Sequence, residues 1–125
     1  MSSENVEKED PELIGMSLYE QLVDCVEDDA SLLPELVMKL RDADVSGQFL
    51  ASSARYLCAV DRERFEPWIV PLVECAIEKD RERRYISSLL EAIWGTDYAE
   101  RVEELNRIDN NFRRIYKRIH PGEGM

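Results

Sequence analysis

Apolar side chains recur along this chain at helical spacing, in segments separated by short polar stretches. Six such segments follow one another almost end to end, and each is preceded by a residue suited to capping a helix N-terminus. Short polar side chains accept hydrogen bonds from the unpaired N–H groups of a first helical turn, so this regularity predicts an all-α fold of about three antiparallel helix pairs. The predicted capping residues are Ser17, Ser31, Ser46, Asp61, Asp80 and Asp97.

The apolar positions also predict where the helices end and what they bury. The fourth segment contains Pro67 and Pro71, which predict either a turn over 62–66 before a helix or one kinked helix ending near Lys79. Gly95 is placed to end the fifth helix in the left-handed conformation. The sixth helix starts at Asp97 and either runs to Ile119 or is interrupted at the weak helix formers Asn110 and Asn111. The residues that we expect in the core are Leu22, Leu36, Leu57, Leu72, Leu89, Ile93 and Leu105.

The chain is predicted to form a single domain between two irregular ends. Residues 1–15 are polar, acidic and without periodicity, so we expect a disordered N-terminal segment. Residues 16–120 form the predicted all-α domain, and residues 121–125 a flexible C-terminus. A length of 125 residues is enough to bury a core without disulfides or metal.

The spacing of the predicted caps gives the chain a period. Two successive helices occupy roughly 30–36 residues, which is in the range of helical-hairpin repeats. In period and amphipathicity, residues 17–119 resemble HEAT- or armadillo-like hairpins. Pro67 and Pro71 are the kind of prolines that such repeats carry. No consensus residue recurs among the three pairs. The resemblance implies a short right-handed α-solenoid-like stack, and an irregular helical bundle satisfies the same pattern.

Composition narrows the class of protein and its location. Hydrophobic residues make up 44% and charged residues 34%, which is typical of a folded helical protein. No run of apolar residues approaches the ~18 that a membrane span needs, so no membrane partner is expected. The acidic N-terminus differs from a secretion signal, and an odd number of cysteines on apolar faces favours a reducing compartment. We therefore expect a cytoplasmic protein.

Motifs for catalysis or for cofactors are absent. His120 is the single histidine, no Cys-x-x-Cys pair exists, and the glycines form no phosphate-binding loop. Acid–base chemistry by paired carboxylates stays open because 27 acidic residues produce chance pairs, although we interpret the acidic side of the first helix as a solvated face. We expect no cofactor, no metal and no enzymatic activity. The acidic side consists of Glu20, Asp24, Glu27 and Asp28.

Charge is distributed unevenly in a chain of net charge -11. Residues 1–30 contain ten acids and one base, whereas residues 101–125 contain six bases and four acids. This asymmetry indicates either a surface for a partner or two ends of one fold that attract each other.

Two basic segments are candidate binding surfaces. Residues 80–84 alternate acids and arginines and favour contact with phosphate or an acidic partner, or else a solvated turn. The C-terminal helix is expected to present a basic face opposite an apolar seam that includes Ile108. Arg and Asn side chains contact phosphates and base edges, but we favour a face that offsets the acidic first helix. The residues of this face are Arg107, Asn110, Asn111, Arg114, Lys117 and Arg118.

Together these observations favour a non-enzymatic cytoplasmic scaffold that binds another protein through a face of its helix stack. The alternative is a nucleic-acid-associated protein that uses the basic C-terminal face, which a sequence pI near 4.5 disfavours.

Overall fold

The computed structural model describes residues 10–121, and this part of the chain is all-α, as predicted, with no strand. Residues 1–9 and 122–125, for which we predicted disorder and flexibility, lie outside the described residues. The helices are α2 (Pro11–Asp28), α3 (Leu33–Ala43), α4 (Gln48–Lys79), α5 (Ser87–Trp94), α6 (Val102–Ile108) and α7 (Asn110–Ile119), with 3₁₀ turns η1 (Ala30–Leu32) and η2 (Tyr98–Arg101).

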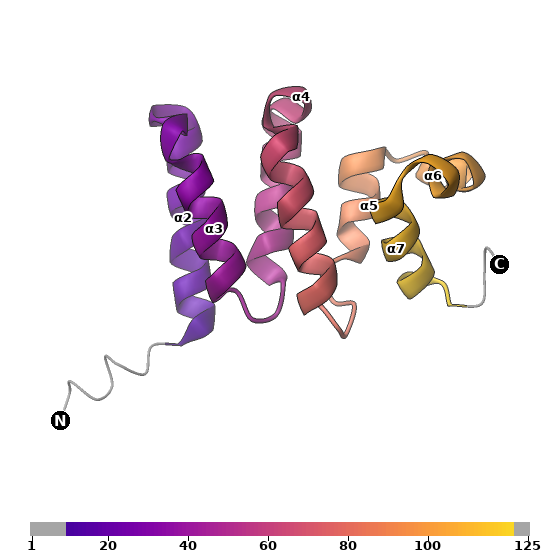
Figure 1. Ribbon diagram of the computed structural model, residues 1–125, viewed down its shortest axis with the longest axis horizontal. Coiled ribbons are helices and arrows are strands. Elements are labelled where there is room, and N and C mark those ends of the chain that lie inside the picture. The colour runs from indigo at the N-terminus through magenta and orange to yellow at the C-terminus, as the bar shows by residue number, and fades with distance from the viewer. Residues whose placement is uncertain (1–9, 122–125) are drawn as a thin grey trace.

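The helices form an elongated stack in which each pair packs on its neighbours (Figure 1). α2 and α3 pack on each other and on α4, while α5 and α7 pack on the other side of α4. Among the described helices, α2 and α3 make no contact with α5 or α7. The stack therefore has two separate ends, one formed by α2 and α3 and the other by α6 and α7 (Figure 1).

The first helix begins earlier than the sequence pattern predicted. The carboxylate of Asp10 accepts a hydrogen bond from the Glu12 N–H at 3.0 Å, and Pro11 opens α2. Residues 11–15 are therefore helical, and Ser17 lies inside α2 rather than at its cap. Gly15 is required at this position, because a Cβ atom there would meet the Phe49 ring at 2.5 Å.

Inside each of the first two helix pairs, an aspartate caps the turn that leads into the second helix of the pair. Ser31, a predicted cap, instead donates its N–H and Oγ–H to Asp29. Asp61 breaks α4 with extended backbone angles and accepts the Arg64 N–H at 3.1 Å, which confirms its predicted role. Because 62–79 then continue as one helix containing Pro67 and Pro71, the second of the two predicted alternatives is the correct one.

The two loops that join the helix pairs have the same geometry. Buried carboxylates of Asp44 and Asp80 each accept hydrogen bonds from the backbone N–H groups five and six residues later, at 2.7–2.9 Å. The third residue after each aspartate has a positive φ, +89° at Gly47 and +60° at Arg83. Asp80 does not open the fifth helix as predicted, because α5 begins only at Ser87; Asp80 instead ends α4, and its carboxylate holds the loop before α5. Ser46 accepts the Gln48 N–H at the start of α4. The sequence comparison of the pairs missed this recurrence.

Of the two alternatives for the segment from Asp97 to Ile119, the interrupted helix is the correct one, with the break at Asp109, next to Asn110 and Asn111. Asp97 forms no capping hydrogen bond with its side chain, and Asp109 has an extended backbone that separates α6 from α7. The Asp109 carboxylate accepts the Phe112 N–H at 3.1 Å and Trp94 Nε1–H at 2.8 Å. Because this contact with α5 fixes the corner, Ile108 is 66% exposed instead of joining the apolar seam.

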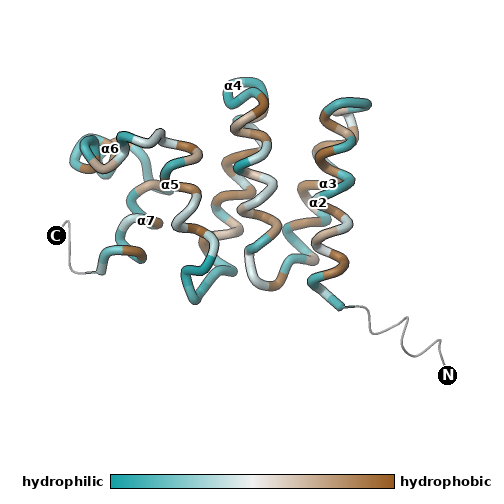
Figure 2. The backbone as a smooth tube through the Cα atoms, turned by 180° about the vertical axis from the view of Figure 1, so that it is seen from behind, coloured by the Kyte–Doolittle hydropathy of each residue, from teal (hydrophilic) through white to brown (hydrophobic). Residues whose placement is uncertain are grey.

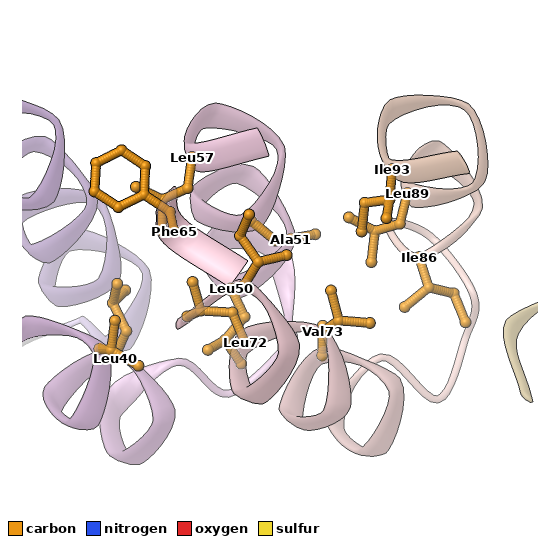
Figure 3. Close-up of a cluster of buried hydrophobic side chains, with 14 of the residues drawn as sticks. Leu40, Leu50, Ala51, Leu57, Phe65, Leu72, Val73, Ile86, Leu89 and Ile93 are labelled. Atoms are coloured by element: carbon orange, nitrogen blue, oxygen red, sulfur yellow. The ribbon is translucent and has the colours of Figure 1, made fainter. Parts of the chain in front are cut away.

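The core runs through the stack as one cluster of buried side chains (Figure 3). All seven side chains that we predicted to be buried are at most 6% exposed. The small residues Ala51, Ser53 and Ala54 are fully buried where α4 crosses the middle of the molecule. Hydrophobic and hydrophilic residues alternate along each helix (Figure 2), which gives each helix an apolar side to pack against its neighbours. Gly95 ends α5 as predicted, but its φ of 99° and ψ of 158° lie outside the left-handed helical conformation that we expected.

Candidate functional site: a basic groove between α4 and α7

Cations near the ends of two helices bind the backbone of the preceding pair. Lys79 donates from Nζ to the carbonyls of Arg41 and Asp44. Arg118 repeats this contact one pair later, donating from Nη1 to the Ile77 carbonyl and from Nη2 to the Asp80 carbonyl at 2.8 Å. These contacts satisfy carbonyls at a helix C-terminus and place positive charge where the helix dipole favours it.

Beside Arg118 lies a groove of about 780 Å³ between the end of α4 and α7. Arg83 connects the loop after α4 to α7, because its Nη1 donates to the Arg118 carbonyl at 3.0 Å. Glu78 is the one acidic residue among those that line the groove. We call this feature the basic groove; its lining residues are Ile77, Glu78, Arg81, Arg114, Lys117 and Arg118.

Three cations of the basic groove have no partner among residues 10–121. Arg81 and Lys117 are exposed and Arg114 is partly exposed, and none of the three side chains forms a hydrogen bond or ion pair within this range. By contrast, Arg84 in the same loop pairs with Glu82 at 2.8 Å. Unpaired guanidinium and ammonium groups that face one groove attract carboxylate or phosphate groups.

The structure brings together only half of the predicted basic face. Arg114, Lys117 and Arg118 line the basic groove, whereas the break at Asp109 places Arg107 on α6, outside it. Asn110 is also outside, because its Oδ1 accepts a hydrogen bond from Arg113 Nη2 at 2.6 Å and so stabilises the corner.

Asn111 does not line the groove and instead borders a second, smaller cavity. The buried Oδ1 of Asn111 accepts no hydrogen bond from the described residues, and the cavity, of about 70 Å³, is also lined by Trp94 and Asp109. Arg81 is the groove residue that the predicted basic face did not include. Residues 80–84, which include Arg81, were identified in the sequence as a separate basic segment. Nothing in the sequence indicated that this segment lies beside α7.

The acidic first helix does not offset the basic groove, contrary to the interpretation that we favoured from the sequence. α2 and α7 lie at opposite ends of the stack and make no contact (Figure 1). What holds Arg118 in place is the backbone of α4 and Asp80 rather than an acidic side chain of α2. The charge asymmetry of the sequence therefore becomes a separation of charge along the molecule.

In the part of the chain that the structure describes, the cysteines and acidic residues form no cluster that could hold a metal ion. Burial raises the pKa of the Cys25 thiol, and the nearby carboxylates of Asp29 and Asp24 raise it further. Burial also raises the pKa of Cys58, against an opposing effect of Arg62. Within residues 10–121, no group of three or more His, Cys, Asp or Glu side chains is arranged to hold a metal ion.

Comparisons with protein-family models, with curated proteins and with solved structures found no match to this chain. Across residues 10–121, no helix has both the length and the apolar character required to cross a membrane. The fold and the groove therefore define the class to which this chain belongs: an all-α protein with an elongated helix stack and a cationic groove near one end.

Proposed function

We propose that this chain is a non-enzymatic cytoplasmic adaptor that binds an acidic segment of another protein in the basic groove. The observation that carries the proposal is the group of three unpartnered cations, Arg81, Arg114 and Lys117, around one groove. Acidic residues are abundant in this chain of net charge -11, yet these cations pair with none of those that the structure describes. We infer that the cations attract an acidic partner instead of neutralising neighbouring side chains.

The arrangement of the cations supports a protein partner. Arg118 is fixed by two backbone carbonyls, and its hydrogen bonds hold α7 against the end of α4. The groove is thus built on helix ends that are already ordered, which lowers the entropic cost of binding. Nucleic acid is disfavoured as the partner by the acidic composition of the chain, whose sequence pI is near 4.5.

The experiment is a titration with two labelled probes followed by fluorescence anisotropy. The first is a short peptide of alternating Glu and Ser, and the second is single-stranded DNA of similar length. We expect the wild type to bind the peptide more tightly than the DNA. The double variant Arg81→Glu/Lys117→Glu should bind the peptide at least about tenfold more weakly, because both changed side chains line the groove.

The matched control is Lys39→Glu/Arg107→Glu, which makes the same change in net charge at exposed positions outside the groove. It should bind the peptide nearly as well as the wild type. An equal loss in both variants, or no binding of either probe, would contradict the proposal. Tighter binding of the DNA, lost only in the groove variant, would instead favour a nucleic-acid-associated function.

A further inference from the structure

An exposed stripe runs along the outer side of α2. Its first part is apolar, since Leu13 is 62% and Met16 41% exposed. Glu20, Asp24 and Glu27 continue it, and all three are exposed. Because successive members are three or four residues apart, they lie on one side of the helix, and the carboxylates span about 10 Å. We call these five residues the α2 stripe.

The carboxylates of the α2 stripe have no basic partner among residues 10–121. α2 contains no Lys or Arg, and none of the ion pairs in this range includes one of its residues. α7 has the opposite composition, with Arg113, Arg114, Lys117 and Arg118 and no acidic residue. The same chain thus carries an unpaired row of carboxylates at one end and unpaired cations near the other.

These two surfaces cannot neutralise each other within one molecule, because α2 and α7 lie at opposite ends of the stack (Figure 1). We propose that the α2 stripe of one copy docks in the basic groove of a second copy, so that the chain associates head to tail. This inference depends on the proposed function, since it uses the same groove and makes a second copy one of its acidic protein ligands.

The chemistry of both surfaces matches this occupant. Asp24 and Glu27 are three residues apart on α2, as Arg114 and Lys117 are on α7, so the two rows of charge have a common spacing along their helices. Arg81 provides a further cation from the loop after α4. Leu13 and Met16 add apolar area next to the carboxylates, and burying it contributes to association without a charge partner.

Head-to-tail contact has two consequences for the assembly. The two surfaces differ, so the interface is heterologous, and copies add in a row unless the rotation between them closes a ring. Each copy also carries a net charge of -11, so repulsion opposes contact at low salt. Near 0.15 M salt, charges more than about 8 Å apart are largely screened from each other. The repulsion between whole molecules is then weakened more than the attraction between charges in direct contact. At about 1 M salt the charge contacts themselves are screened.

The test uses two variants of the full chain, each with one surface reversed. Glu20→Lys/Asp24→Lys changes the α2 stripe and leaves the groove intact. Arg81→Glu/Lys117→Glu changes the groove and leaves the stripe intact. All four side chains are exposed, so both variants should keep the helical circular dichroism of the wild type. The control Glu63→Lys/Glu74→Lys changes two exposed acids of α4 by the same charge.

Sedimentation velocity at 0.15 M salt then gives the result. We expect the wild type and the control to associate with rising concentration, and each surface variant alone to associate at least about tenfold more weakly. An equimolar mixture of the two surface variants should associate more strongly than either variant alone, because the intact groove of one meets the intact stripe of the other and the two reversed surfaces are again opposite in charge. A wild type that stays monomeric to about 1 mM, or a mixture without complex, would overturn the inference.

The same samples separate this inference from the proposed function. If the wild type binds the Glu–Ser peptide in the groove but does not associate with itself, the proposed function stands and the head-to-tail inference falls. If it neither binds the peptide nor associates, both fall. Association that persists in both surface variants would show a different interface and would also overturn the inference.

Discussion

The guanidinium of Arg118 donates a hydrogen bond to the carbonyl of Asp80 at 2.8 Å, and the carboxylate of the same aspartate accepts three backbone N–H groups of the following turn. One residue therefore connects three parts of the molecule: the end of α4, the loop before α5, and α7. Lys79 makes the corresponding contact with Asp44 one pair earlier. These repeated contacts between loop and helix hold successive pairs in position.

Replacing Arg118 should destabilise the fold. Arg118→Ala removes hydrogen bonds to two carbonyls at the end of α4, and we expect a loss of about 1–3 kcal/mol in the free energy of unfolding, measured in urea. Arg118→Lys should recover part of this loss, because Lys79 makes the equivalent contact with an ammonium group. Arg107→Ala, at an exposed position, is the control; a loss as large as that of Arg118→Ala would contradict the assignment.

Two aspartates that looked equivalent in the sequence should behave differently. Asp80→Ala leaves three backbone N–H groups without their acceptor in a buried site, so it should cost about 2 kcal/mol or more. Asp97→Ala should change stability by less than about 0.5 kcal/mol, since Asp97 is exposed and caps nothing with its side chain. Thermal or urea unfolding of both variants checks the difference, and equal effects would refute it.

The positive φ angles of the two loops predict different results for substitutions at Gly47 and Arg83. Gly47→Ala should destabilise by about 1 kcal/mol or more, because φ is +89° and the new Cβ would meet Asp80 Cβ at 3.1 Å. Arg83→Gly removes the strain of a non-glycine residue at a φ of +60°, but it also removes the hydrogen bond from Arg83 to Arg118. These two effects on the free energy of unfolding should nearly cancel. A stabilised Gly47→Ala variant would show that the loop relaxes.

The stability contributed by the hydrogen bonds between Ser31 and Asp29 should depend on pH. Hydrogen bonds from the Ser31 side chain and backbone lower the pKa of Asp29 below its ordinary value of 3.8. A carboxyl group with a lowered pKa in the folded state stabilises above its unfolded pKa, and this contribution is lost as the pH falls through the folded pKa. Ser31→Ala should therefore be less stable than the wild type at pH 7, with the difference shrinking below about pH 3.8. A pH-independent difference in urea unfolding would contradict this.

The thiols of Cys25 and Cys58 should react slowly in the native protein. Burial raises the pKa of both, which lowers the fraction of reactive thiolate at neutral pH. A small disulfide reagent should label them slowly in buffer and rapidly in urea, with the Cys75→Ser variant simplifying the count. Rapid native labelling of Cys25, which is only 4% exposed, would mean that the α2–α3 end opens readily.

The sequence alone determined the helical class, the apolar side of each helix and several local features. Leu22, Leu57 and Leu89 are buried because helical periodicity places them on an inward face whatever the neighbours are. The cap at Asp61 and the end of α5 at Gly95 were also predictable, since a capping residue and a helix-terminating glycine depend on the chemistry of a few adjacent residues.

Tertiary structure decided the remaining features, which depend on contacts between distant residues. The first turn of α2 was not predicted, because Leu13 and Met16 point outward, while Gly15 is explained only by the Phe49 ring beside it. The break at Asp109 follows from a hydrogen bond to Trp94 across the stack. Packing also placed Arg81 beside α7 and separated the two charged ends, because linear sequence does not specify which helix ends meet.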